Sequence, residues 1–304
     1  MLEFDFGHIQ MVEFGVGRDN EYERTFCLIA VDGDVQDALQ EMAEATWIAM
    51  MKLTDVPPRY EPSEKHAGIE YLHLPLNDNL AASMRELYEA NNLPIDMLAL
   101  NNPERVFCYF ARLIDTQGRR LTALRRATQF KGILKNRLIR LMTDALKIVE
   151  DKVFKLDTDF DLLIDSQNVH ILRPSGFEFT GQLQEAIMAA VSNNVTAIKT
   201  DISFVNFDVI ESYASQHPRA ARYLASIHSQ AESRNIDRDR LVQLCDHTGV
   251  ETAEADGQIT VTEKHVMGFL EVLDRRRYEI ELVTGAPEQY RAASRSKLDS
   301  EAGP

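Results

Sequence analysis

The sequence has few cysteines and no long apolar run, and both absences narrow the class of protein. Its 304 residues include only three cysteines, Cys27, Cys108 and Cys245, which are widely spaced and form no C-x-x-C pair. Neither a disulfide framework nor a thiolate zinc site is indicated, so we expect reduced, buried thiols. No apolar stretch approaches the ~18 to 20 residues that span a bilayer, and the N-terminus lacks the pattern of a secretory signal. These absences predict a cytoplasmic protein.

The motifs of the common enzyme classes are also missing. The sequence contains no Walker A loop, no G-x-S-x-G nucleophile elbow and no H-E-x-x-H pair, and its histidines never reach metal-ligand spacing. Gly15-Val16-Gly17 lacks the third glycine of a dinucleotide site. We therefore predict no catalytic residue, no cofactor and no metal, and we interpret the chain as a non-catalytic protein.

Positive charge is concentrated in one segment of an otherwise acidic chain. The formal net charge is −15, yet residues 118–155 carry 11 Lys and Arg against 3 acids, a local net charge of +8. Residues 1–117 carry −13 and residues 156–304 carry −10. Because acidic surfaces repel polyanions, a cationic patch has to face one partner to hold phosphate against the field of the whole molecule.

Hydrophobic periodicity predicts an α+β fold, with small mixed sheets and packed helices in two domains. A long helix is expected from Asp34 to the Pro57-Pro58 stop, and Val106–Ala111 with the turn at Gly118 predicts a central strand that returns at Arg119. Other strands are expected at 8–16, 25–31, 69–76, 160–164, 169–172, 258–261 and 278–283, with helices between them and a polar end from Pro287.

The charge boundary suggests a domain boundary. We expect an acidic N-terminal α+β domain at 1–117 and a C-terminal domain at 118–304, which begins with a basic strand and helix at 118–155. The helix is predicted from an apolar stripe that starts at Leu134 and ends at Val149, and cationic residues gather opposite this stripe.

The basic segment is the candidate nucleic-acid site. Arg offers bidentate contacts to phosphate and Lys a point charge, and six to ten such contacts give salt-sensitive binding without sequence preference. The alternative is that these side chains pair with the acidic N-terminal half or with an acidic partner. The predicted phosphate contacts are Arg119, Arg120, Arg125, Arg126, Lys131, Lys135, Arg137, Arg140 and Lys147.

Three smaller charged groups have a structural and a functional interpretation. Asp157, Asp159 and Asp161 have the alternate spacing of a calcium loop, but Leu162 stands where glycine is needed, so we interpret them as a solvated strand edge. The run Arg275–Arg277 complements the dipole at the end of a helix, with a contact site as the alternative. Glu150-Asp151-Lys152 matches an E-x-K pattern of Mg²⁺-dependent nucleases, although such triplets are frequent by chance.

The second half of the chain resembles a known family. Its strand-turn-strand, the Phe-Glu that leads into a helix, and a Leu-rich helix followed by a Leu-x-Thr-Gly turn and a Tyr are similar to the signature of the KwaB subunit of the Kiwa anti-phage defence system. The resemblance covers roughly residues 105–300, with Arg275–Arg277 in place of the usual polar residues after the Leu-rich helix. The residues that carry it are Phe160–Asp165, Val169–Pro174, Gly176–Glu178, Phe269–Asp274, Glu281–Gly285 and Tyr290.

The resemblance implies a function that composition alone does not. It implies a cytosolic, dimeric subunit that binds double-stranded DNA, acts with a membrane-embedded Kiwa A subunit at the inner face of the membrane and blocks phage replication or transcription. Two alternatives stay open at this point. One is a Mg²⁺-dependent nuclease centred on Glu150 and Lys152, and the other is a scaffold without DNA binding.

Overall fold

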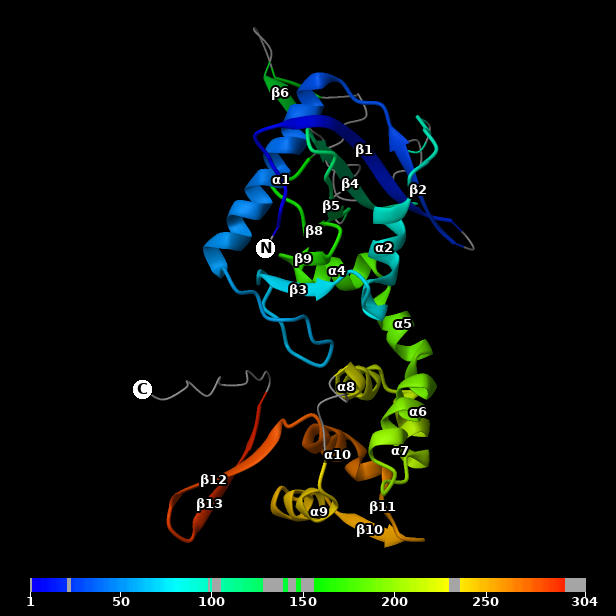
Figure 1. The fold of residues 1–304 in the computed structure, drawn as a ribbon, viewed down its shortest axis with the longest axis vertical. Helices are drawn as coiled ribbons and strands as arrows, with labels where there is room; N and C mark the ends of the chain where they lie inside the picture. The colour runs from blue at the N-terminus through cyan, green and yellow to red at the C-terminus, as the bar shows by residue number, and fades with distance from the viewer. Residues whose placement is uncertain are drawn as a thin grey trace. The chain divides into compact units, whose positions relative to one another are not determined.

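A computed structural model describes residues 2–20, 23–97, 99, 105–127, 139–141, 146–148, 156–229 and 236–292. Contacts divide the chain into two compact units, Met1–Tyr60 with Ala67–Gln182, and Glu61–His66 with Leu183–Pro304. Helices and antiparallel strands occur in both units, so the predicted α+β class is confirmed (Figure 1). The sequence placed a boundary at residue 117, whereas this division falls at residue 182, because the strands on either side of residue 117 pair within one sheet.

The first unit is built on a seven-stranded sheet in which every pair of neighbours is antiparallel. The order is β2-β1-β4-β5-β8-β9-β3. The strands are β1 (Ile9–Asp19), β2 (Arg24–Ile29), β3 (Leu72–Pro75), β4 (Val106–Asp115), β5 (Arg120–Arg126), β8 (Leu162–Ile164) and β9 (Asn168–Ile171).

Both faces of the sheet are covered. Helix α1 (Gly33–Leu53) packs Leu39 and Met42 against Tyr109 and Ala111 of β4. The opposite face carries α2 (Ala82–Glu89), which follows the short 3₁₀ helix η1 (Asn79–Ala81), and α4 (Pro174–Thr180). A strand buried on both faces reads as a continuous apolar run, which is why the sequence identified β4 as central. Figure 1 shows α1 running along the sheet.

The turn between β4 and β5 is organised by Asp115. Its carboxylate accepts hydrogen bonds from the backbone N–H groups of Gln117 and Arg119, and from Nε of Arg119 at 2.6 Å. Gly118 has φ +75, a left-handed conformation that glycine adopts without strain. The turn predicted at Gly118 is therefore confirmed.

The second unit is mainly helical. Helix α8 (Pro218–Ser229) lies among α5 (Leu183–Ala189), α6 (Val191–Asp201), α7 (Asp208–Ala214) and α10 (Val266–Leu273). The unit also contains α9 (Arg238–His247), the short 3₁₀ helix η5 (Glu263–His265) and two hairpins, β10 (Thr252–Ala255) with β11 (Gln258–Val261), and β12 (Arg277–Val283) with β13 (Ala286–Arg291). Strand β13 gives a regular structure to the first residues of the end that was predicted as polar and partly mobile from Pro287, and its side chains are exposed. The later residues of that end lie outside the described part of the chain.

The basic helix predicted from Leu134 to Val149 is wrong where the structure describes this segment. Residues Ile139–Leu141 form β6 and Leu146–Ile148 form β7, which pair as an antiparallel hairpin. The apolar residues of these strands alternate with Arg140 and Lys147, so the sequence also satisfies a period of two. The helix was predicted from the spacing of the apolar residues alone, without considering this alternation.

Two further expectations can be compared with the structure. All three cysteines are buried and free, as predicted. Among the helices that the structure describes, none has both the length and the apolar composition needed to cross a membrane.

Thr46 joins α1 to the strand region around Phe160 and generates a stability prediction. Its buried Oγ1 donates to the carbonyl of Met42 and accepts the N–H of Phe160 at 2.8 Å. Thr46→Val leaves the buried N–H of Phe160 unpaired, so we expect a loss of about 1–3 kcal/mol in the free energy of unfolding, measured in urea. Thr196 makes the same bond to the carbonyl four residues earlier but is exposed, so Thr196→Val should change stability by less than about 0.5 kcal/mol. Equal losses in the two variants would contradict this role.

Asp115 generates a prediction about pH. Burial would raise the pKa of Asp115, but hydrogen bonds from the backbone and guanidinium of Arg119 and from Gln117 outweigh burial and lower it. A lowered pKa stabilises the fold above the pKa of the unfolded chain, and this contribution is lost as pH falls through the folded value. We expect Asp115→Asn to lower the unfolding free energy at pH 7, and the difference from the wild type to shrink below pH ~4.

The comparison uses urea unfolding at several pH values. Asp55→Asn, at an exposed position, is the control and should keep a constant difference from the wild type across the series. A constant deficit in Asp115→Asn would mean that the ion pair does not carry the effect.

Candidate nucleic-acid interface

Strand β5 and the residue just before it supply four of the predicted phosphate contacts, and the pleat divides them into two pairs. Successive side chains of a strand point to opposite faces of the sheet, so Arg120 and Arg126 share one face. Arg125, and Arg119 directly before the strand, have the opposite alternation. The two pairs differ in whether carboxylates neutralise them. This difference separates structural arginines from those whose charge is available.

Arg119 and Arg125 are neutralised within the chain. Nε of Arg119 lies 2.6 Å from the buried carboxylate of Asp115. Arg125 lies among Asp157, Asp159 and Asp161, with its nearest contact 2.9 Å from Nη1 to Oδ1 of Asp161. Burial alone would lower the pKa of Arg125, but these carboxylates raise it overall. The alternative of pairing within the chain therefore holds for these two residues.

Arg120 and Arg126 have no carboxylate partner in the described part of the chain. Arg120 donates to the carbonyl of Tyr88 at 2.8 Å and to Oδ1 of Asn91 at 3.0 Å, and it lies over the ring of Tyr88. Arg126 stacks its guanidinium 3.8 Å from the ring centroid of Phe179, and its Nε has no hydrogen-bond partner. Neutral partners orient both groups without cancelling their charge, which suits contacts to phosphate.

Arg120 borders a hollow in the surface of the first unit. The hollow has a volume of about 460 Å³, and Tyr88, Gln167 and Arg119 also line it. Two acids line it as well, Glu3 and Asp165. The carboxylate of Asp165 accepts hydrogen bonds from His170 and from two backbone N–H groups, which lower its pKa although burial would raise it. The hollow thus places Arg120 beside an aromatic ring and two carboxylates.

The other predicted contacts lie beyond β5. Arg140 and Lys147 are direct register partners in the β6–β7 hairpin, so two cationic residues occupy opposite positions of one ladder. Lys131, Lys135 and Arg137 lie outside the described residues, as do Glu150 and Lys152 of the nuclease alternative.

The three aspartates that we predicted as a solvated edge form the internal charge network of the first unit. Asp161 is only 3% exposed, and Arg173 joins the network with Nη2 2.9 Å from Asp159. Tyr109 donates its hydroxyl to Asp157 at 2.9 Å. The partners are far apart in sequence, so no local spacing could reveal them. Among the described residues, no group of three or more acids, histidines or cysteines could hold a metal ion.

The motif Gly176-Phe177-Glu178 has a packing role beside this network. A Cβ at Gly176 would lie 2.3 Å from Oδ2 of Asp161, so only glycine lets α4 approach this carboxylate. Phe177 is fully buried and packs its ring against Tyr60, whose hydroxyl donates to Glu178 at 2.7 Å. These residues position α4 and therefore Phe179, on which Arg126 stacks.

The run Arg275–Arg277 is divided between core and surface. The side chain of Arg276 is fully buried and donates to Asp274 at 2.6 Å and to Ser63 at 2.9 Å. Arg277 donates to the buried Glu271 at 2.8 Å, whereas Arg275 is exposed. The second arginine of the run therefore stabilises the unit, which neither the helix-dipole nor the contact interpretation predicted.

Comparison with known proteins gives the family. The family model described as Kiwa protein KwaB-like matches residues 113–282, which include β5, the aspartate network and the Gly-Phe-Glu motif. No curated protein and no solved structure matches the chain. The match contains most of the residues on which the resemblance was based, although Val283–Gly285 and Tyr290 lie beyond it. Because it covers more than half of the sequence, the chain belongs to the Kiwa protein KwaB-like family.

Proposed function

We propose that this Kiwa anti-phage defence subunit binds double-stranded DNA through the basic segment 118–155. The observation that carries the proposal is the pair Arg120 and Arg126, which share one face of β5 and have no carboxylate partner among the described residues. From Thr116 to Thr143 the sequence contains cations and no acid, so the segment that continues from β5 adds to the same positive potential.

Ion pairs within the chain support a narrower set of proposed contacts than the sequence gave. Arg119 and Arg125 are assigned to the fold because carboxylates of the same chain hold them. The remaining contacts bind phosphate oxygens and give affinity without reading bases. They are Arg120, Arg126, Lys131, Lys135, Arg137, Arg140 and Lys147.

The proposed mechanism is occupancy. The subunit covers invading DNA and blocks replication or transcription, and no bond is made or broken by this chain. The acidic remainder of the protein repels nucleic acid elsewhere on its surface, so contact with host DNA or RNA is confined to the same small patch.

The proposal includes two protein partners. The acidic N-terminal half offers a docking surface for a membrane-embedded Kiwa A subunit, because cytoplasmic loops of membrane proteins are enriched in Lys and Arg. This contact would hold the subunit at the inner face of the membrane, where injected DNA enters. A second copy of the chain completes a homodimer, which doubles the number of cationic patches available to one duplex.

Neutral substitution of the two free arginines tests the DNA site. We expect Arg120→Gln with Arg126→Gln to weaken duplex binding at low salt and to lower the slope of log affinity against log salt by about 2, since each lost phosphate contact removes about 1. Fluorescence anisotropy of a labelled duplex across a salt series measures both quantities. Arg240→Gln, at an exposed position of the second unit, is the matched control and should leave the slope unchanged. An unaltered slope in the double variant would exclude Arg120 and Arg126 as contacts.

A plasmid assay separates binding from cleavage. Supercoiled plasmid incubated with the protein and Mg²⁺ should migrate more slowly and return to its original form after the protein is removed with detergent. A nuclease would leave nicked or linear plasmid, and Glu150→Gln would abolish the nicking. Nicking that Glu150→Gln abolishes would replace the occupancy mechanism by the nuclease alternative.

A further inference from the structure

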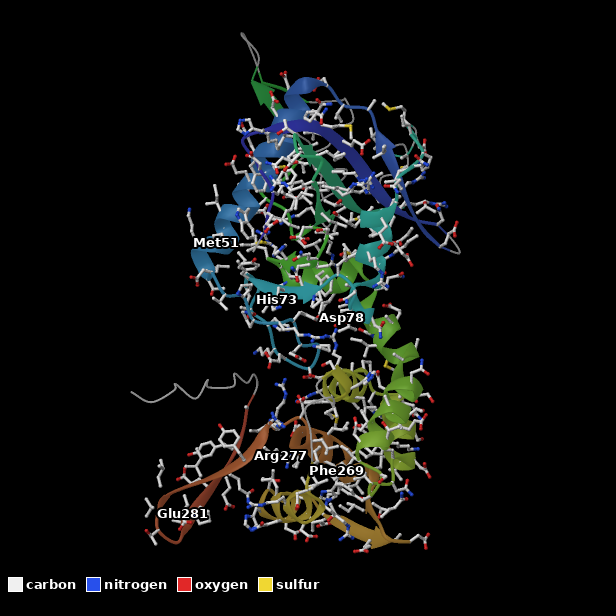
Figure 2. The ribbon with its side chains drawn as sticks, in the orientation of Figure 1. Met51, His73, Asp78, Phe269, Arg277 and Glu281 are labelled. Atoms are coloured by element: carbon white, nitrogen blue, oxygen red, sulfur yellow. The ribbon has the colours of Figure 1, made fainter. Side chains whose placement is uncertain are left out.

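Three arginines of the second unit converge on one buried carboxylate, and the DNA-binding proposal makes no use of them. The side chain of Glu271, in α10, is only 2% exposed. Its Oε2 accepts Nε of Arg277 at 2.8 Å, and its Oε1 lies 3.3 Å from Nη2 of Arg219 and 3.6 Å from Nη1 of Arg291. We call these four side chains the Glu271 cluster. Figure 2 labels Arg277 where the β12–β13 hairpin begins and Phe269 in the adjacent helix α10.

The packing of the second unit holds the three guanidinium groups in place. Arg219 is the second residue of α8, and its guanidinium carbon lies 5.9 Å from the ring centroid of Tyr223, which is 3% exposed. Arg277 and Arg291 are register partners in the β12–β13 hairpin. A helix and a strand pair therefore direct their arginines to the same carboxylate. Groups that are already oriented lose less conformational entropy when they bind a ligand.

The charge of the Glu271 cluster is not balanced. Three guanidinium groups share one carboxylate, which leaves an excess of two positive charges. Each guanidinium has five N–H donors. Arg219 uses its donors for Glu271 and Tyr223, and the side chain of Arg291 makes no hydrogen bond to any described residue. These two side chains are 62% and 60% exposed. The cluster thus offers two oriented cations to the solvent.

Arg275 adds a cation at a position where glycine is the usual residue. Helix α10 ends with the N–H of Arg276 bonded to the carbonyl of Glu271 and the N–H of Arg275 bonded to the carbonyl of Val272. Arg275 has φ +56, the left-handed conformation that glycine most often supplies at such a helix end. Its side chain is exposed and makes no ion pair with the described residues. Packing does not explain this arginine, whereas a role for its charge does.

Phosphate matches the Glu271 cluster in charge and in geometry. A phosphate monoester carries about −1.5 to −2 charges at pH 7, close to the excess of the cluster. The fork of a guanidinium binds two phosphate oxygens at once, which a simple point charge does not do. Arginine clusters are a common means of recognising phosphate groups in proteins.

The surroundings of the cluster favour a small ligand over a polymer. Residues 183–304, which make up most of the second unit, carry 13 Lys and Arg against 19 acids. Glu279 shares the hairpin face of Arg277 and Arg291 and lies 3.4 Å from the ring of His247. An extended polyanion would meet these acids as soon as it left the cluster, whereas a single phosphate contacts the arginines alone.

We infer that Arg219 and Arg291 bind a phosphate group, either as inorganic phosphate or as the terminal phosphate of a small molecule. Glu271 holds both guanidinium groups toward the site, Arg277 holds Glu271, and Arg275 adds to the positive potential. This site lies wholly within the second unit and is independent of where DNA binds.

The first experiment titrates inorganic phosphate into the full chain by calorimetry in chloride buffer at constant ionic strength. We expect a dissociation constant on the order of 0.1–1 mM, and Arg219→Gln with Arg291→Gln should raise it about 30-fold or more because two charged donors are lost. Arg240→Gln with Lys264→Gln removes two exposed cations from the same unit and should leave it unchanged. No saturation by about 10 mM phosphate, or an equal loss in both double variants, would overturn the site.

The source of the phosphate is tested with adenosine 5′-monophosphate in the same titration. Affinity equal to that of inorganic phosphate would support a site for free phosphate, and tighter binding would support a site for a phosphate monoester. Glutarate carries two negative charges without phosphate geometry and should bind at least about 10-fold more weakly. Glutarate that binds as tightly as phosphate would overturn the assignment in favour of an acidic peptide.

Thermal unfolding supplies a measurement that does not depend on loss of binding through misfolding. Phosphate should raise the melting temperature of the wild type above its value in chloride at equal ionic strength, because a ligand of the native state stabilises it. Arg275→Gly should melt in chloride at the same or a higher temperature, since glycine removes the left-handed strain, yet show a smaller rise with phosphate. An equal rise in this variant would overturn the role of Arg275.

The phosphate site and the DNA site can fail separately. Arg219→Gln with Arg291→Gln should keep the salt slope of duplex binding, and Arg120→Gln with Arg126→Gln should keep the phosphate affinity. A duplex slope that falls by about 2 in the first variant would make the cluster part of the DNA surface and overturn the small-ligand assignment. Phosphate affinity that is lost only in the second variant would place phosphate at the DNA site and overturn the inference.

Discussion

The constraint on which the first unit depends is that β4 and β5 are buried on both faces while they carry charged residues. A buried charge is tolerated only with a compensating partner, because removal from water costs far more than packing returns. Asp161 with Arg125 and Arg173, and Asp115 with Arg119, supply that compensation. These ion pairs determine which charges of the strand are neutralised. Carboxylates neutralise Arg119 and Arg125. Arg120 and Arg126 are oriented by neutral groups and keep their charge.

The difference between neutralised and unneutralised arginines determines how much positive charge the basic segment presents on an acidic protein. A count of charges treats every Lys and Arg in 118–155 as equal, yet a guanidinium enclosed by three carboxylates adds no positive potential outside. The hydrogen bonds of Arg120 to Tyr88 and Asn91 and the stacking of Arg126 on Phe179 fix the positions of these two cations, so in the proposed function less conformational entropy would be lost on binding phosphate. In the proposed function, affinity from such contacts would be independent of sequence, which suits defence against DNA of unknown origin.

Some residues of the family signature are buried and pack within the chain, whereas others are exposed. Gly176 and Phe177 are required by the close approach of α4 to Asp161, and the Leu-rich helix α10 holds the buried Glu271. The Leu-x-Thr-Gly turn and Tyr290 instead lie on an exposed hairpin, where burial within one chain does not account for them. The contrast explains why residues that identify a family need not identify its site, and why the exposed part of a signature is the more informative about partners.

The sequence by itself determined the α+β class, the central hairpin of β4 and β5, the turn at Gly118 and the buried, free cysteines, because these follow from local periodicity, turn chemistry and composition. Local patterns failed where two periods fit the same residues, as at β6 and β7, and where the hairpin β12–β13 continues past Pro287. Only the tertiary structure decided which arginines are neutralised and that Arg276 is buried. The partners lie 4 residues away at Arg119 and 32 to 36 away at Arg125. Arg276 pairs with Asp274 two residues away, but it also contacts Ser63 and Glu64, more than 200 residues away, and only chain folding brings such distant groups together.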